Sequence, residues 1–126
     1  MDLKKIYQER VLDHYNHPRH TQALEQVDMS SGVFNPSCGD SVHIEGTVTN
    51  GVLTHARFSA KGCVISCAAA SMLLEHAINT TIAQIEALTP SMMQKMVSIP
   101  LGPTRLRCAL LPLEALQNAL RDYQKK

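Results

Sequence analysis

The chain has 126 residues, of which 44% are hydrophobic and 18% charged, and its formal net charge is +1. This length suits one domain, spanning residues 1–126, with one hydrophobic core. The small net charge gives no reason to expect nucleic acid or an anionic membrane surface as a partner, and no apolar run approaches the roughly 20 residues of a membrane span. The charged start of the chain does not resemble a signal peptide, so we expect a cytoplasmic location.

The first third of the chain predicts a helix followed by irregular structure. Apolar residues recur at helical spacing over residues 2–17, and Pro18 ends the pattern. The polar stretch 19–32 predicts a loop or an irregular strand. Proline and glycine then mark a turn over residues 34–40.

A β-hairpin is the clearest local feature of the sequence. Apolar and polar residues alternate from Val42 to Val48 and again from Ala56 to Ala60. Asn50-Gly51 stands between the two runs, and this dipeptide favours a two-residue type I′ turn.

Helical signals follow the hairpin. A helix is expected to begin at or just after Cys63, and Thr81 to Gln84 resembles a capping box that opens a short helix. Thr89-Pro90 is typical of an N-cap followed by proline at the first helical position. A proline- and glycine-rich loop over residues 100–103 is expected to deliver Cys108, and a final helix is expected to begin at Pro112. The order of elements predicts an α+β fold, in which several helices pack against a small antiparallel sheet of about three strands.

The four cysteines indicate metal or thiol chemistry, because a chain with this apolar content needs no disulfide framework. Cys38, Cys63 and Cys108 are each expected at a boundary between elements, where side chains can converge. Asp40 follows Cys38 after one glycine. Three thiolates and one carboxylate supply the four ligands of a tetrahedral site, and thiolates suit zinc, iron–sulfur units and copper(I).

Two features favour the thiolate form of these cysteines. Cys63 is expected at the positive end of a helix dipole, and Lys61, Arg105 and Arg107 lie close in sequence to Cys63 or Cys108. Spacing alone leaves two readings equally open. The cysteines are either metal or sulfur ligands, or free thiols beside an aspartate that forms a turn.

Several motifs in order decide between these readings. The segments that carry the resemblance are Asp13-His14-Tyr15-Asn16-His17-Pro18-Arg19, Asn35-Pro36-Ser37-Cys38-Gly39-Asp40, Gly62-Cys63-Val64-Ile65-Ser66 with the alanines that follow it, and Arg107-Cys108-Ala109. Together they resemble the IscU/SufU (NifU N-terminal-like) family of iron–sulfur cluster assembly scaffolds. The resemblance runs along almost the whole chain and implies a helical, three-stranded, SufE/NifU-like α+β fold.

The resemblance also implies a function and a site. Cys38, Cys63 and Cys108 would be the ligands of zinc or of a transient [2Fe-2S] cluster, with Asp40 as the nearby carboxylate. The same three cysteines are candidate acceptors of persulfide sulfur from a PLP-dependent cysteine desulfurase. Recipient apoproteins or a carrier would take the cluster. The chain would then be a scaffold or sulfur relay and not a turnover enzyme.

The chain departs from the family pattern at three places. IscU-type members carry a histidine before the last cysteine, where this chain has Arg107, as SufU-type members have a basic residue. Residues 102–106 do not reproduce the LPPVK segment of IscU-type members, so a specialised Hsp70 chaperone is a doubtful partner. The insertion that SufU-type members carry between the second and third cysteines is absent. Cluster scaffold and zinc-dependent sulfur relay therefore both stay open.

The remaining candidates have alternatives of their own. Cys67 lies one helical turn after Cys63, where the family usually has no cysteine, and it is expected either as a small buried side chain or as a fourth thiol at the site. His14, His17 and His20 are expected in surface or packing roles, because Pro18 breaks their helical register. The rival functions are a zinc-stabilised thiol protein without an assembly role, and a thiol redox protein.

Overall fold

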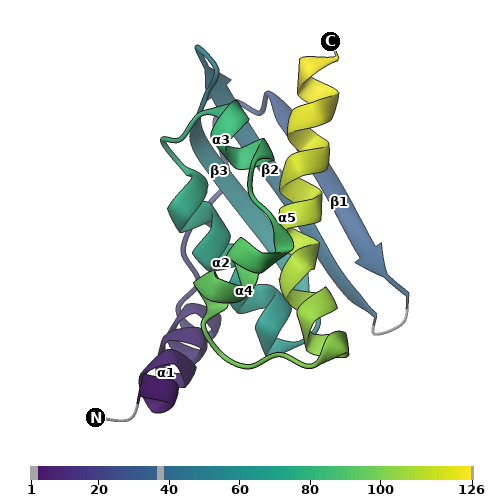
Figure 1. The fold of residues 1–126 in the computed structure, drawn as a ribbon. Helices are drawn as coiled ribbons and strands as arrows, with labels where there is room; N and C mark the ends of the chain where they lie inside the picture. Colours follow the sequence, from purple (N-terminus) through teal and green to yellow (C-terminus); the bar gives the residue numbers. More distant parts are fainter. Residues whose placement is uncertain (1–2, 37–38, 126) are drawn as a thin grey trace.

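The computed structural model describes residues 3–36 and 39–125. Its elements in chain order are α1 (Leu3–Asn16), β1 (Met29–Asn35), β2 (Asp40–Thr49), β3 (Val52–Lys61), α2 (Val64–Ala77), α3 (Ile82–Glu86), α4 (Pro90–Val97) and α5 (Pro103–Gln124). Figure 1 shows a sheet with α2 and α5 lying side by side across one of its faces. The predicted α+β class is confirmed.

The sheet is antiparallel, with strand order β1-β2-β3. Its helix-covered face is apolar, and the buried residues on it include Val42, Ile44 and Phe58. Side chains of a strand point alternately to opposite faces, so every second residue of β2 enters the core that α2 and α5 complete. These three elements form the frame that positions the site.

The predicted hairpin is confirmed. Asn50 and Gly51 both have positive φ angles, 52° and 76°, as a type I′ turn requires. The turn joins β2 to β3, and a register shift lies next to it, between Thr47 and Val48.

The expectation for the segment before the hairpin was partly wrong. Residues 29–35 form a regular edge strand, so the strand extends into the segment that we expected as a turn. The serines and Gly32 give this strand a weak alternation signal. Its pairing with β2, and the packing of Met29 into the core, supply what its own sequence lacks.

The expectation for the last helix was wrong in a way that affects the site. α5 begins at Pro103, after Gly102 at the N-cap, so Cys108 lies inside a helix and not after a loop. Pro112 lies in the interior of the same helix and does not start it. Proline has no N–H, so it cannot donate to the carbonyl of residue 108, four positions earlier. The Ser66 hydroxyl, 3.3 Å from that carbonyl, shares its proton between the carbonyl and Asp40.

The predicted helix starts in the middle of the chain are confirmed. Thr81 forms a capping box with Gln84, and Thr89 caps α4 with Pro90 in the first turn. Cys63 is the N-cap of α2, where its sulfur accepts a hydrogen bond from the Ser66 backbone N–H.

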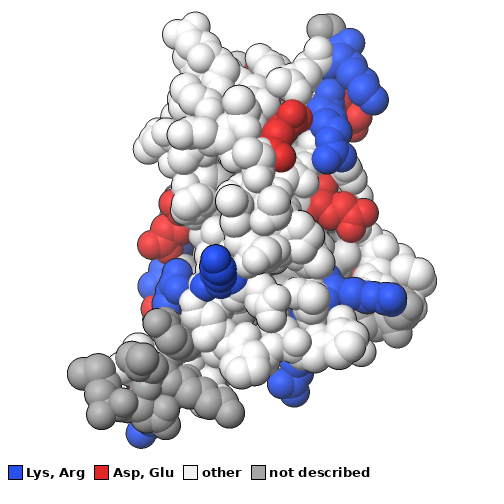
Figure 2. Space-filling model, viewed as in Figure 1, with Lys and Arg blue, Asp and Glu red and all other residues white. Residues whose placement is uncertain are grey.

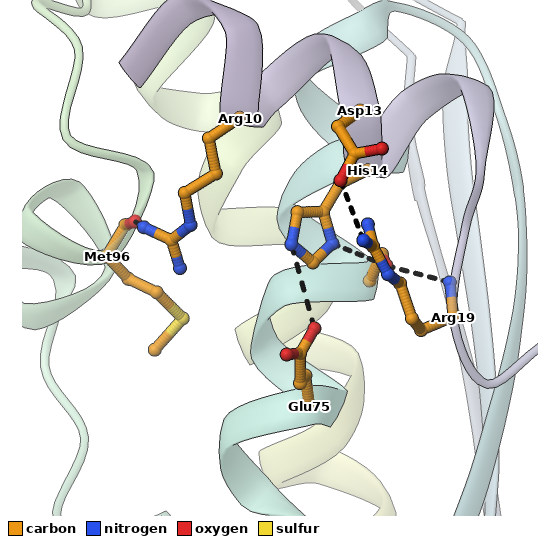
Figure 3. Close-up of polar contacts among 7 residues, drawn as sticks. Arg10, Asp13, His14, Arg19, Glu75 and Met96 are labelled. Atoms are coloured by element: carbon orange, nitrogen blue, oxygen red, sulfur yellow. Dashed lines mark hydrogen bonds and ion pairs between the residues drawn. The ribbon is translucent and has the colours of Figure 1, made fainter. Parts of the chain in front are cut away.

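A polar cluster fastens α1 to α2 (Figure 3). His14 is buried; its Nδ1 lies 2.8 Å from the Ser71 hydroxyl, and its Nε2 lies 3.6 Å from a Glu75 carboxylate oxygen. The Arg19 backbone N–H also donates to the Ser71 hydroxyl. Burial lowers the pKa of His14, as do the nearby charges of Arg19 and Arg10, while Glu75 and Asp13 oppose the shift. The ring is therefore held in its neutral form, in the packing role expected for it.

Candidate metal centre

Three of the four predicted site residues come together in space. Asp40 is the first residue of β2, Cys63 caps α2, and Cys108 lies in the second turn of α5. A carboxylate oxygen and the two sulfurs all lie within 4.8 Å of one another. The fourth predicted residue, Cys38, lies outside the described residues.

The sheet register explains this convergence. Ser41 of β2 pairs with Lys61 of β3, so the end of β3 runs directly beside Asp40. The chain then turns at Gly62, and Cys63 begins α2 next to the carboxylate. α5 packs on α2 and on the sheet, which brings Cys108 to the same point.

Asp40 is buried, with 3% of its surface exposed, and each of its carboxylate oxygens accepts a hydrogen bond. The Cys63 backbone N–H donates to Oδ1 at 3.1 Å, and the Ser66 hydroxyl donates to Oδ2 at 2.6 Å. Burial raises the pKa of this carboxyl, but hydrogen bonds from Ser66, from the Cys63 and Cys108 thiols and from the Cys63 N–H outweigh it and bring the pKa to about 2. The site therefore holds a buried negative charge.

Gly62 makes room for that carboxylate. Its φ angle is 135°, which residues with a side chain rarely adopt. A Cβ at this position would lie 2.0 Å from Asp40 Oδ1 and 2.3 Å from its Cγ. Only glycine allows the backbone to pass this close to Asp40.

Ser66 is the site residue that sequence reasoning missed. Its buried hydroxyl contacts Asp40, the Cys108 carbonyl and, at 3.5 Å, the Cys63 sulfur. Its backbone N–H donates to the same sulfur at 3.4 Å. The signal was its spacing: Ser66 lies three residues after an N-cap, where the backbone N–H meets the capping side chain.

Cys108 corrects an expectation. We expected the neighbouring arginines to favour its thiolate, but Arg105 and Arg107 are exposed whereas only 3% of Cys108 is exposed. Burial, together with the Asp40 and Cys63 groups, raises the pKa of the Cys108 thiol to about 12. The sulfur is protonated at neutral pH until a metal displaces the proton.

Cys67 lies next to this group but does not join it. Its side chain is half-buried, not buried as one expectation had it, and it is not among the side chains that converge as a fourth thiol would. Burial raises the pKa of this thiol, and the nearby Cys63 and Asp40 groups raise it further.

The donor set fits a thiophilic metal. Two sulfurs and one carboxylate oxygen are three of the four ligands that zinc takes in a tetrahedral site, and thiolates also hold iron–sulfur clusters. Within residues 3–36 and 39–125 this is the one group of three or more such side chains near enough to share an ion. Neither His17 nor His20 belongs to it.

Comparison with known proteins places the chain in a family. Residues 6–126 match the family described as NifU-like N terminal domain. The chain belongs to this family.

Its curated relatives include assembly proteins from yeast and bacteria. The chain is 33% identical to iron sulfur cluster assembly protein 1, mitochondrial, of Debaryomyces hansenii over 100% of this chain and 72% of the relative. It is 30% identical to the iron-sulfur cluster assembly scaffold protein IscU of Haemophilus influenzae, over 95% of this chain and 97% of the relative. The predicted resemblance is thus confirmed.

Solved structures share the fold of this NifU-like chain. A putative SUF-system scaffold protein from Fervidobacterium islandicum superposes with a TM-score of 0.79 at 23% identity, covering 94% of this chain and 99% of the other. The N-terminal NifU-like protein of Brucella abortus gives a TM-score of 0.78 at 22% identity, covering 98% of each chain.

The surface charge of this family member is mixed, and its described helices are short or polar. Lys and Arg side chains are interspersed with Asp and Glu on the face shown in Figure 2. Of the helices in the described part of the chain, none is both long and apolar enough to cross a bilayer.

Proposed function

We propose that this chain is an iron–sulfur cluster assembly scaffold, or a zinc-dependent sulfur acceptor, that receives persulfide sulfur from a cysteine desulfurase. The observation that carries the proposal is the convergence of Asp40, Cys63 and Cys108 within 4.8 Å at the meeting point of β2, α2 and α5. Family membership and the scaffold relatives support it. Cys38 is the proposed fourth ligand.

Exposure makes Cys63 the proposed acceptor among the described cysteines of the ligand group. Its thiol is half-buried, whereas Cys108 is buried and protonated. In the transfer, the Cys63 thiolate attacks the terminal sulfur of the desulfurase persulfide. A new S–S bond forms at Cys63, and the desulfurase cysteine leaves as a thiolate with the electron pair of the broken bond.

Asp40 is suited to be a ligand that later dissociates from the metal. Its two oxygens already accept hydrogen bonds from Ser66 and from the Cys63 N–H. When the carboxylate leaves a metal, these donors keep its charge stabilised. A carboxylate is also a weaker partner for a soft ion than a fourth thiolate.

The proposed cargo is zinc or a transient [2Fe-2S] cluster, and the proposed recipients are apoproteins or a carrier. Residues 102–106 include the N-cap and first turn of α5 and differ from the segment read by a specialised Hsp70 chaperone, so that partner stays doubtful. A single domain over residues 1–126 remains a proposal. A cytoplasmic location also remains a proposal, since two yeast relatives carry mitochondrial names.

Sulfur transfer tests the proposal. The protein is incubated with a cysteine desulfurase and isotopically labelled cysteine, and intact mass is compared for wild type, Cys38→Ser, Cys63→Ser and Cys108→Ser. We expect wild type to take up one labelled sulfur, measured as label on the protein together with sulfide released from it, and Cys63→Ser to take up none, with bound zinc or iron reduced in all three variants. Ser59→Ala, at an exposed position on β3 outside the ligand group, is the control and should take up sulfur and bind metal as wild type does.

Two results would contradict the proposal. If wild type takes up no sulfur, and wild type and every variant bind zinc tightly, the chain is a zinc-stabilised thiol protein. If sulfur transfer is absent while thiol oxidation and reduction proceed equally with and without metal, the chain is a thiol redox protein.

A further inference from the structure

α2 presents a second thiol to the proposed acceptor. Cys63 is the N-cap of the helix, and Cys67 lies four residues later, with its backbone N–H bonded to the Cys63 carbonyl at 3.3 Å. This bond closes the first turn of α2 and places Cys67 one turn along the chain from Cys63. Both thiols are half-buried.

Cys67 differs from the ligands in one respect. It does not belong to the group whose atoms lie within 4.8 Å of one another. A metal held by Asp40, Cys63 and Cys108 therefore does not need it, and it remains available for sulfur exchange with its neighbour.

We propose that Cys67 is a built-in reductant that releases the sulfur carried by Cys63 as sulfide. The inference rests on the proposed function, because it requires a persulfide on Cys63. The class of ligand is sulfane sulfur, and the product is the sulfide that a cluster contains.

The two cysteines at the start of α2 supply both electrons that reduce the bound sulfur. The Cys67 thiol loses its proton to water, and its sulfur attacks the inner sulfur of the Cys63 persulfide. A Cys63–Cys67 disulfide forms, the bond to the outer sulfur breaks, and that sulfur leaves as hydrosulfide with the electron pair. The outer sulfur is reduced by two electrons, and the two cysteine sulfurs are oxidised. A dithiol reductant from solution then restores both thiols.

The helix can close this bridge at its first turn. Side chains four apart have Cβ atoms about 5–6 Å apart on an ideal helix, whereas a disulfide brings them to about 3.5–4.5 Å. Cys63 has extended backbone angles, φ −75° and ψ 163°, and lies outside the regular helix. The turn can therefore tighten there. A disulfide formed under such strain is more easily reduced, which suits a thiol pair that must be recycled.

The first experiment follows sulfide from the full-length protein. Wild type, Cys67→Ser and Cys67→Ala are loaded by a desulfurase with labelled cysteine, freed of small molecules, and kept without reductant. Trypsin then yields one peptide, residues 62–95, that contains both cysteines, because Lys61 and Lys95 flank it. We expect wild type to release the label as sulfide and its peptide to lose two hydrogens. Both variants should keep the added sulfur and release it at least about tenfold more slowly.

A second experiment does not depend on a desulfurase. In Cys38→Ser/Cys108→Ser only Cys63 and Cys67 remain of the four cysteines. With substoichiometric DTNB, this protein should release two thionitrobenzoates for each DTNB consumed. The first leaves when Cys63 reacts, and the second leaves when Cys67 attacks the mixed disulfide on Cys63. With Cys67→Ser added, only one should be released for each DTNB. The far-ultraviolet circular dichroism spectrum checks that each variant is folded.

The outcomes separate the two proposals. Equal sulfide release from wild type and Cys67→Ser, or label that moves intact to Cys67, overturns the reductant role and leaves the acceptor role standing. No label on any protein overturns the acceptor role. In that case one equivalent of thionitrobenzoate from the two-cysteine protein overturns the reductant chemistry as well, whereas two equivalents support it.

Discussion

Ser66→Ala is the substitution that most directly tests how the site is built. The change removes a hydroxyl whose single proton is shared between Asp40 Oδ2, at 2.6 Å, and the more distant Cys108 carbonyl, at 3.3 Å. Asp40 is buried, so water cannot readily replace the lost donor. Hydrogen bonds to charged groups contribute about 1.5–3 kcal/mol, and a buried carbonyl left without a donor costs about 1 kcal/mol or more. We expect the free energy of unfolding to fall by about 2–4 kcal/mol at pH 7.

The same change should alter the acid dependence of stability. The pKa of Asp40 is about 2 in the folded protein against 3.8 for the unperturbed group. A lowered pKa means that the unfolded chain binds the proton more readily. The carboxylate therefore contributes stability above pH 3.8, about 2 kcal/mol in full, and loses it as the pH falls towards 2. In Ser66→Ala the pKa moves back up, so the difference between the two proteins should narrow by about 1 kcal/mol between pH 7 and pH 3.

Urea denaturation of the metal-free proteins measures both effects. Ser59→Ala, an exposed position on β3, is the control and should change the free energy of unfolding by less than about 0.5 kcal/mol. Pro112→Ala restores an N–H donor to the Cys108 carbonyl, so Ser66→Ala should cost about 1 kcal/mol less in that background. A cost below about 0.5 kcal/mol for Ser66→Ala at pH 7, or a cost that does not change by pH 3, would refute the reasoning.

Three further predictions concern the frame around the site. Gly62→Ala should lower the free energy of unfolding by about 3 kcal/mol or more and weaken zinc binding, because its Cβ would collide with Asp40 at positive φ. Gly102→Ala is the control and should be tolerated, because a Cβ there would meet no atom within 4 Å. Equal urea midpoints and zinc affinities for the two variants would contradict this prediction. Burial lowers the pKa of His14 from 6.5, so the unfolded chain binds a proton more readily than the folded chain, and the urea midpoint should fall as the pH drops below 6.5. His14→Gln should reduce this pH dependence of the midpoint. Parallel pH profiles for wild type and His14→Gln would rule out the effect. Chelation of bound metal should leave most of the helical circular dichroism signal, because among the candidate ligands in the described residues only Cys108 belongs to the buried apolar cluster. Complete unfolding would instead indicate a structural zinc.

Local patterns in the sequence determined much of the architecture. Asn50-Gly51 specified the hairpin because its φ angles suit a type I′ turn, and Thr81 and Thr89 specified helix starts because their side chains accept bonds from nearby N–H groups. The motifs around Cys38, Cys63 and Cys108 identified the family. All of these signals act over a few residues, so a single sequence shows them.

Tertiary structure alone decided the rest. Pro112 is a helix breaker by its local chemistry, yet α5 continues through it because its apolar residues pack on the sheet and Ser66 satisfies the carbonyl that the proline leaves free. The edge strand exists because β2 supplies its partners. The state of Cys108 depends on burial and not on the arginines beside it in sequence. Each of these outcomes depends on groups far apart in the chain, whose distances exist only once the sheet and the two helices have packed.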